Sequence, residues 1–159
     1  MKWPYLVVGI VVCLAGVVNA GDNDYCWGEE PQYFLTCLEQ AFNSADMDRL
    51  SDLYAEDFVS EEYHGKEKKV IGNREETLAQ QRRIFDRGTK FEVEFGPVVV
   101  DEIEPGKLWR LDASWSNKMT QASGDSITIS MDKSFIIVRR VDNPQSHYEM
   151  VSWAGVWDE

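Results

Sequence analysis

The chain has 159 residues, which is enough for one domain with its own hydrophobic core. It carries 28 acidic and 16 basic side chains, giving a formal net charge of −12 at pH 7. We therefore exclude nucleic acid as an expected partner, because binding to phosphates needs a cationic surface.

The first 20 residues predict a secretory signal peptide. Lys2 precedes an apolar run from Trp3 to Val18, and small residues close the segment at Ala20. An apolar run this short is more typical of a cleaved leader than of a membrane span. An uncleaved membrane anchor is the alternative, because only one positive charge precedes the run. We expect a secreted or periplasmic protein with no membrane attachment after cleavage. The expected divisions are a signal peptide over 1–20, an N-terminal extension over 21–30 and one domain over 31–159.

Two cysteines, Cys26 and Cys37, remain after the predicted cleavage site. A pair of thiols in an exported protein favours one disulfide, which here would tie the extension to the first helix. Two free, buried thiols are the alternative that the sequence leaves open.

Helical signals fill most of the first half of the domain. Phe34, Leu38 and Phe42 lie on one apolar stripe at helical spacing. Asp46 is a good N-cap for a second helix. Asn73 forms a capping-box pattern with the glutamate three residues later, which predicts the start of a third. The expected helices run from Pro31 to Ser44, from Met47 to Tyr54 and from Arg74 to Arg87.

The second half of the chain alternates apolar and polar residues, which is typical of half-buried strands. Gly96-Pro97 interrupts the first long alternating run and predicts a bend or bulge there. Three helices followed by a long antiparallel meander make an α+β domain. The expected strands are Phe58–Gly65, 90–103, 109–116, 127–138 and Tyr148–Trp157, with an exposed loop over Lys66–Lys69.

The stretch from Leu38 to Gly65 places Asn43, Asp46, Asp48 and Leu50 at fixed spacing before the run Leu53–Val59. In this order and spacing the stretch resembles the nuclear transport factor 2-like superfamily, also called the SnoaL-like or cystatin-like cone fold. Its recurrent opening is a helix, then N-x-x-D-x-D-x-L, then L-(F/Y)-A-(D/E)-D-(F/A)-V. The resemblance implies a strongly curved antiparallel sheet that wraps three N-terminal helices as a cone over about residues 31–157. It does not fix the function, because this fold hosts enzymes, transport factors and binding modules. The matching residues are Asn43, Asp46, Asp48, Leu50, Leu53, Tyr54, Ala55, Glu56, Asp57, Phe58 and Val59.

The ketosteroid isomerase branch of this superfamily aligns without a gap from Leu53 to Gly65. The resemblance then places the general base on Glu62 and the second acid, which donates to the oxyanion, near Asp132. The tyrosine that is the other oxyanion donor falls on Leu38, which has no hydroxyl, so the catalytic set is incomplete. His64 is an alternative base, as in dehydratase branches that pair histidine with aspartate. A solvated surface position is the alternative for Glu62, Asp132 and His64 alike.

The strand pattern bears on Asp132 in particular. Strict alternation places Asp132 on the face opposite Ile127, Ile129 and Met131. If those apolar residues face the cone, Asp132 faces outward, unless a bulge near Lys133-Ser134 changes the phase.

Wide aromatic side chains occur at positions that could line the cone. Such residues either fill the core or contact a flat apolar ligand. His64 and His147 lie far apart and outside any Cys/His cluster, so we expect no metal site and no cofactor. The candidate ligand-binding residues are Tyr54, Phe58, Phe91, Trp109, Trp115 and Trp153, with Trp157 also possible.

Three functions are consistent with these observations. The first is an exported module that binds a small apolar molecule in its cone without catalysis. The second is an isomerase, dehydratase or cyclase that uses Glu62 or His64 as general base. The third is an oligomerisation or protein-interaction subunit that pairs through the sheet face, with a homodimer as the expected state.

Overall fold

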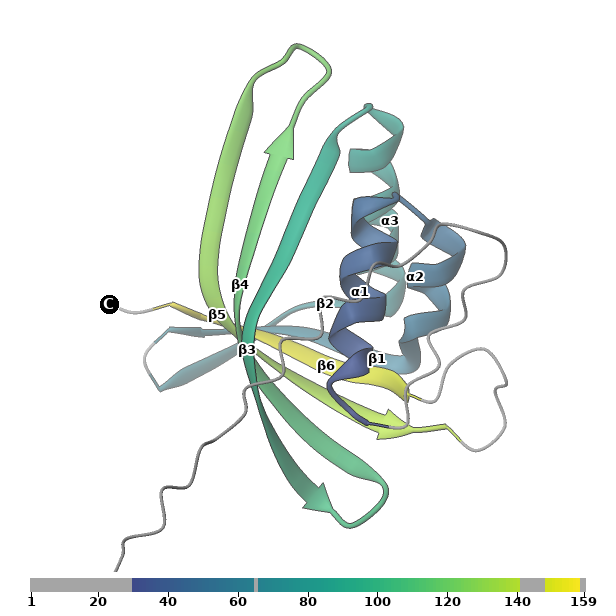
Figure 1. Cartoon of the computed structure of the whole chain (residues 1–159), viewed down its shortest axis with the longest axis vertical. Coiled ribbons are helices and arrows are strands. Elements are labelled where there is room, and N and C mark those ends of the chain that lie inside the picture. Colours follow the sequence, from purple (N-terminus) through teal and green to yellow (C-terminus); the bar gives the residue numbers. More distant parts are fainter. Residues whose placement is uncertain (1–29, 65, 141–147, 158–159) are drawn as a thin grey trace, which may run out of the picture.

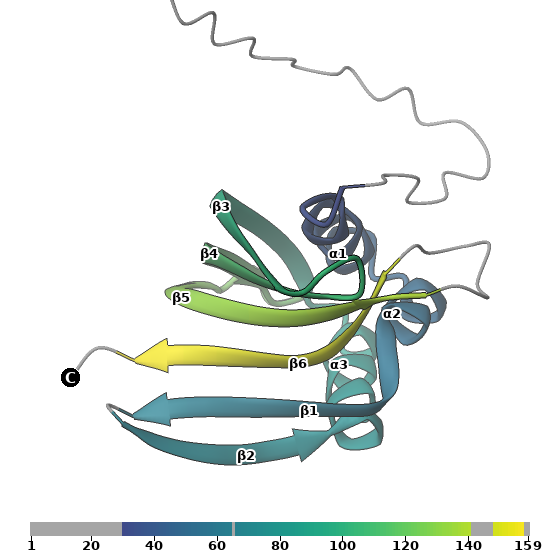
Figure 2. The ribbon, with the colours of Figure 1, turned by 90° about the horizontal axis from the view of Figure 1, so that it is seen from below.

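The structure is a computed structural model that describes residues 30–64, 66–140 and 148–157. Three helices gather on one side of a strongly bent six-stranded sheet, which confirms the predicted α+β class (Figures 1 and 2). No helix in these ranges is both long and apolar enough to cross a membrane. In chain order the elements are α1 (Tyr33–Asn43), α2 (Met47–Leu53), β1 (Tyr54–His64), β2 (Glu67–Asn73), α3 (Arg74–Asp86), β3 (Lys90–Glu104), β4 (Leu108–Thr120), β5 (Ser126–Arg139) and β6 (Tyr148–Trp157).

The strands lie in the order β2-β1-β6-β5-β4-β3. Four neighbouring pairs are antiparallel, as the meander predicts, and the β1–β6 pair is parallel. The last strand returns to the middle of the sheet, between β5 and β1, and so joins the hairpin β1–β2 to the meander β3–β4–β5. The register shift between Phe95 and Val98 confirms the bulge predicted at Gly96-Pro97.

The prediction of an exposed loop over Lys66–Lys69 was wrong. Strand β2 begins at Glu67 and pairs with β1 in antiparallel register, from His64↔Glu67 to Val59↔Asn73. It is an edge strand, and nearly all its side chains are exposed. An edge strand of this kind needs backbone pairing but no apolar face, so no alternating pattern marks it in the sequence.

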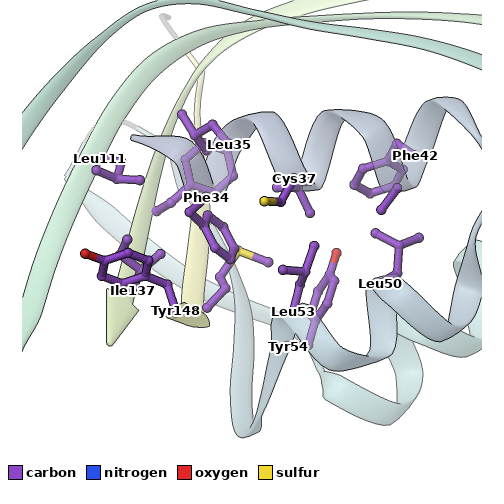
Figure 3. Close-up of a cluster of buried hydrophobic side chains, with 14 of the residues drawn as sticks. Phe34, Leu35, Cys37, Phe42, Leu50, Leu53, Tyr54, Leu111, Ile137 and Tyr148 are labelled. Carbon is purple, nitrogen blue, oxygen red and sulfur yellow. The ribbon is translucent and has the colours of Figure 1, made fainter. Parts of the chain in front are cut away.

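The core lies between the apolar stripe of α1 and the sheet face that curves around it (Figure 3). Leu38 on the helix is fully buried, as are Leu111, Ile137 and Met150 on three neighbouring strands. Burying one such side chain contributes roughly 1.5–3 kcal/mol. We call the sheet face that carries these strand residues the inner face, and the opposite one the outer face.

Polar side chains of α1 close the free edge of β3. Asn43 Nδ2 donates to the Val93 carbonyl oxygen at 3.0 Å, and Val93 N–H donates to Asn43 Oδ1 at 2.6 Å. Phe95 N–H donates to Glu39 Oε2 at 3.4 Å. Burial raises the pKa of Glu39, although the Phe95 N–H partly opposes this effect. These contacts satisfy backbone groups that an edge strand leaves unpaired.

Arg74, the first residue of α3, joins this helix to the end of α2 and to the start of β1. Its Nη2 donates to the Ser51 carbonyl oxygen at 2.8 Å and to Ser51 Oγ at 2.9 Å, and its Nε donates to the Tyr54 carbonyl oxygen at 3.1 Å. Asn73 and Glu76 form the predicted capping box at the start of α3. The α3 start is therefore fixed against the end of α2, where carbonyl groups lack helical partners.

Replacing Asn43 by alanine tests the closure of the β3 edge. The substitution removes both hydrogen bonds to Val93, and we expect the free energy of unfolding to fall by roughly 1–3 kcal/mol. Thr36, an exposed residue of the same helix, is the matched control, and Thr36→Ala is expected to change stability by less than roughly 0.5 kcal/mol. Urea denaturation followed by circular dichroism measures both, and equal stabilities would contradict this account of the edge.

Candidate functional site

A carboxylate and an amine face each other across a glycine on the inner face. Gly155 of β6 pairs with Glu62 on one side and with Lys133 on the other. Lys133 shares its strand face with the buried Phe135 because side chains alternate along a strand. Strands are about 4.8 Å apart, so roughly 10 Å separates the two backbones, and Gly155 places no side chain between them. Both side chains are long enough to approach each other over the glycine.

Two tryptophans flank the amine. Lys133 Nζ lies 3.9 Å from the ring centroid of Trp115 and 4.1 Å from that of Trp153. The Trp153 indole N–H donates to Ser60 Oγ, which fixes the ring beside β1. We call Lys133, Trp115 and Trp153 the lysine cluster. Each of the three residues is partly exposed.

The surroundings of Lys133 destabilise the charged form of its amine. Desolvation between the ring faces lowers the pKa of Lys133 to about 8, and the negative charge of Glu62 opposes this shift. Within the described residues, Lys133 Nζ donates no hydrogen bond, and its contacts are the two indole faces. Cation–π contacts stabilise an ammonium less than full hydration does, which explains the direction of the shift.

Four of the six aromatics predicted to bind a ligand lie in the core. Tyr54 and Phe58 are only 2% and 1% exposed, and Phe91 and Trp109 are also buried. Tyr54, Phe58 and Trp153 form edge-to-face contacts with ring centroids 4.6–6.0 Å apart. Of the six, Trp115 and Trp153 are partly exposed.

Tyr54 also forms a buried polar contact. Its hydroxyl accepts a hydrogen bond from Gln81 Nε2 of α3 at 2.8 Å, and burial raises the pKa of the Tyr54 phenol. The contact links β1 to α3 beneath the aromatic residues.

The predicted acids do not come together. Asp132 is exposed and lies on the outer face, because β4 and β5 pair without a register shift through Lys133 and Ser134. Glu62 is partly exposed on the inner face, so the sheet separates the two carboxylates. Leu38, where the resemblance implies a tyrosine donor, is an apolar core residue.

Several predictions fall on parts of the chain that the structure does not describe. The signal peptide and the N-terminal extension lie there, as does Cys26, so the disulfide with the buried Cys37 stays a prediction. His147 and the side chains of His64 and Trp157 also lie outside the described part. Among the described residues, no group of three or more His, Cys, Asp or Glu side chains could hold a metal ion.

Lys133 is the site residue that sequence reasoning missed. It stands in phase with Ile129 and Met131 before it and with Phe135 and Ile137 after it. A charged residue in phase with apolar ones is a recognisable signal. Without the strand order, however, nothing in the sequence indicates which tryptophans surround it.

The outer face carries a separate shallow groove of about 450 Å³. Glu61 is only 8% exposed there and forms an ion pair with Lys68, with Nζ 2.5 Å from Oε1. Arg110 also pairs with Asp112 at 3.2 Å. The groove crosses β1, β6, β5 and β4 and is lined by Glu61, Tyr63, Arg110, Asp112, Ser134, Ile136, Ser152 and Ala154.

Comparison with known proteins gives similarities in structure alone. No family model matches the chain, and no curated protein matches its sequence. An NTF2-like protein of unknown function in nutrient uptake from Rhodospirillum rubrum shares 15% identity, with a TM-score of 0.66 over 82% of this chain and 100% of that one. The beta subunit of the benzoate 1,2-dioxygenase from Burkholderia mallei shares 15% identity, with a TM-score of 0.62 over 80% of this chain and 87% of that one. A ketosteroid isomerase-like protein from Erwinia carotovora atroseptica shares 15% identity, with a TM-score of 0.55 over 79% of this chain and 91% of that one.

The pKa of Lys133 predicts an alkaline rise in stability. The native value of about 8 lies below the ordinary 10.5, so between these values the unfolded chain binds more protons and stability increases with pH. The variant Lys133→Met has no titrating amine at this position and therefore lacks this pH-dependent contribution to stability. We expect the free energy of unfolding of the wild type, minus that of the variant, to rise by roughly 1–3 kcal/mol from pH 7.5 to pH 10.5.

Denaturant unfolding of both proteins across this range measures the difference. The raised pKa of Tyr54 affects both proteins equally and cancels. A difference that stays constant with pH would mean that Lys133 titrates as an ordinary exposed lysine.

Proposed function

We propose that this chain, which has the nuclear transport factor 2-like fold, is an exported protein that binds a small apolar molecule without catalysing a reaction. The observation that carries the proposal is the lysine cluster, in which Trp115 and Trp153 are partly exposed beside Lys133 on the inner face. Partly exposed indoles offer a flat apolar ligand a stacking surface.

Export rests on the apolar segment 3–18, and the intact mass of protein from a secreting host would identify the mature N-terminus.

The enzyme alternative has weaker support. Glu62 lies on the inner face with a cationic neighbour, but Asp132 lies on the outer face and Leu38 supplies no hydroxyl. Proton abstraction beside a carbonyl needs donors aimed at the developing oxyanion, and two of the three implied groups are missing from the inner face.

A titration with 2-naphthol, a flat apolar probe, tests the binding proposal. We expect the ligand to quench tryptophan fluorescence with saturation. Trp115→Leu should weaken the Kd roughly five- to thirty-fold, because the loss of one stacked ring costs roughly 1–2 kcal/mol. The control is Trp109→Phe, which changes a core tryptophan packed against Tyr148 and should leave the Kd unchanged. Unaltered binding by Trp115→Leu would contradict the assignment of the site.

We also propose that two copies of the chain pair through their outer faces. Small side chains at Ser134, Ser152 and Ala154 leave a shallow groove there, so a second sheet can approach closely. The benzoate dioxygenase protein with the same fold is itself a subunit of a larger enzyme.

Sedimentation equilibrium tests the pairing. We expect a dimer for the wild type and a monomer for Ser152→Arg, because the new cation would be buried unpaired at the interface. Gln80→Arg adds the same charge at an exposed site on α3 and should leave the dimer intact. A wild-type protein that is monomeric at every concentration would overturn the proposal.

A further inference from the structure

The amine of Lys133 differs from the exposed, ion-paired lysines of the chain. Lys68 donates a hydrogen bond to Glu61, and Lys107 donates one to Glu104. In each pair the carboxylate raises the pKa of the amine. Lys133 Nζ lies between two indole faces and has no hydrogen-bond acceptor among the described residues. An ammonium has three N–H donors, all of which are normally hydrated or paired. The structure thus holds one lysine in surroundings that favour the neutral, nucleophilic form.

We propose that Lys133 is a nucleophilic amine that captures small aldehydes or ketones reversibly as an imine. The inference goes beyond non-covalent binding at the lysine cluster and adds a covalent step there. Trp115 and Trp153, which are partly exposed, would hold the apolar part of the carbonyl compound beside Nζ.

Charge and solvation support the chemistry. With a pKa of about 8, about a quarter of Lys133 is neutral at pH 7.5, against about one part in a thousand for an ordinary lysine. Glu62 is the acidic group facing it from β1. Ala113 and Trp115 on β4, and Trp153 and Gly155 on β6, add no ionisable group on the inner face beside it. One carboxylate therefore sets the local charge within the described part of the sheet.

The step balances without an oxidant or reductant. The neutral amine attacks the carbonyl carbon, and one proton passes from the nitrogen to the carbonyl oxygen to give a neutral carbinolamine. The hydroxyl is then protonated and leaves as water, and the nitrogen gives up its second proton to form the neutral imine. Glu62, across Gly155, is placed to accept a proton from the nitrogen and to donate one to the leaving hydroxyl. The products are one imine and one water molecule, and hydrolysis reverses the reaction.

Reductive trapping tests the proposal on the full chain. The protein is incubated with benzaldehyde, a flat apolar aldehyde, and sodium cyanoborohydride, and peptide mapping then locates each added benzyl group. We expect Lys133 to be labelled on the order of tenfold faster than any other lysine, with a rate that rises with pH to a midpoint near 8. The α-amino group titrates in the same range, so only lysine peptides are compared.

Three variants make the test specific. Lys133→Arg keeps a cation between the indoles but forms no imine, so rapid labelling should disappear. Glu62→Gln should move the pH midpoint of Lys133 labelling downward, because the Glu62 charge raises the pKa of this amine. Lys118→Arg replaces an exposed lysine paired with Glu92 and should leave Lys133 labelling unchanged.

The outcomes separate this inference from the proposed function. Labelling spread over lysines according to their exposure, or a midpoint at the ordinary lysine value, would overturn the inference. If 2-naphthol still binds in that case, the non-covalent proposal stands. Selective labelling without 2-naphthol binding would support the amine chemistry and refute the apolar binding site.

Discussion

The fold depends on the closure of α1 over the free edge of β3. The apolar stripe of the helix packs against the curved inner face. Two hydrogen bonds between Asn43 and Val93 hold the C-terminal end of the helix against β3. The two residues lie 50 positions apart in the chain. The contact therefore forms only when β3 is in place beside the N-terminal helices. The Asn43 position is also part of the motif that carries the family resemblance, which gives that motif a structural reason.

The same packing restricts where a ligand can bind. Along β1, Tyr54, Phe58 and Ser60 are buried, whereas Glu62 is partly exposed. Figure 2 shows β1 and β6 extending past the helices toward this end. The aromatics nearest the helices stabilise the core, and only those farther along the sheet, Trp115 and Trp153, remain open to solvent. Ligand access on the inner face is thus a property of the uncovered end of the strands.

Alternation along the strands gives neighbouring residues different roles. Glu61 lies on the outer face and pairs with Lys68, while Glu62 lies on the inner face near Lys133. Asp132 and Lys133 are separated in the same way. Two chemically distinct surfaces therefore share the same strands, and the buried backbone of Gly155 brings the inner pair within reach of each other.

The sequence by itself determined the elements that local signals mark. The stripe of α1, the capping box at Asn73 and the bulge at Gly96-Pro97 all follow from spacing and side-chain chemistry within a few residues. The edge strand β2 was not predicted, because a strand that pairs its backbone but has no buried face carries no such pattern in its sequence. Only the tertiary structure decided that β6 lies between β1 and β5, which places Glu62, Gly155 and Lys133 in one row. Strand order is fixed by the packing of the whole chain, so no local pattern could indicate that a lysine on β5 meets tryptophans from β4 and β6.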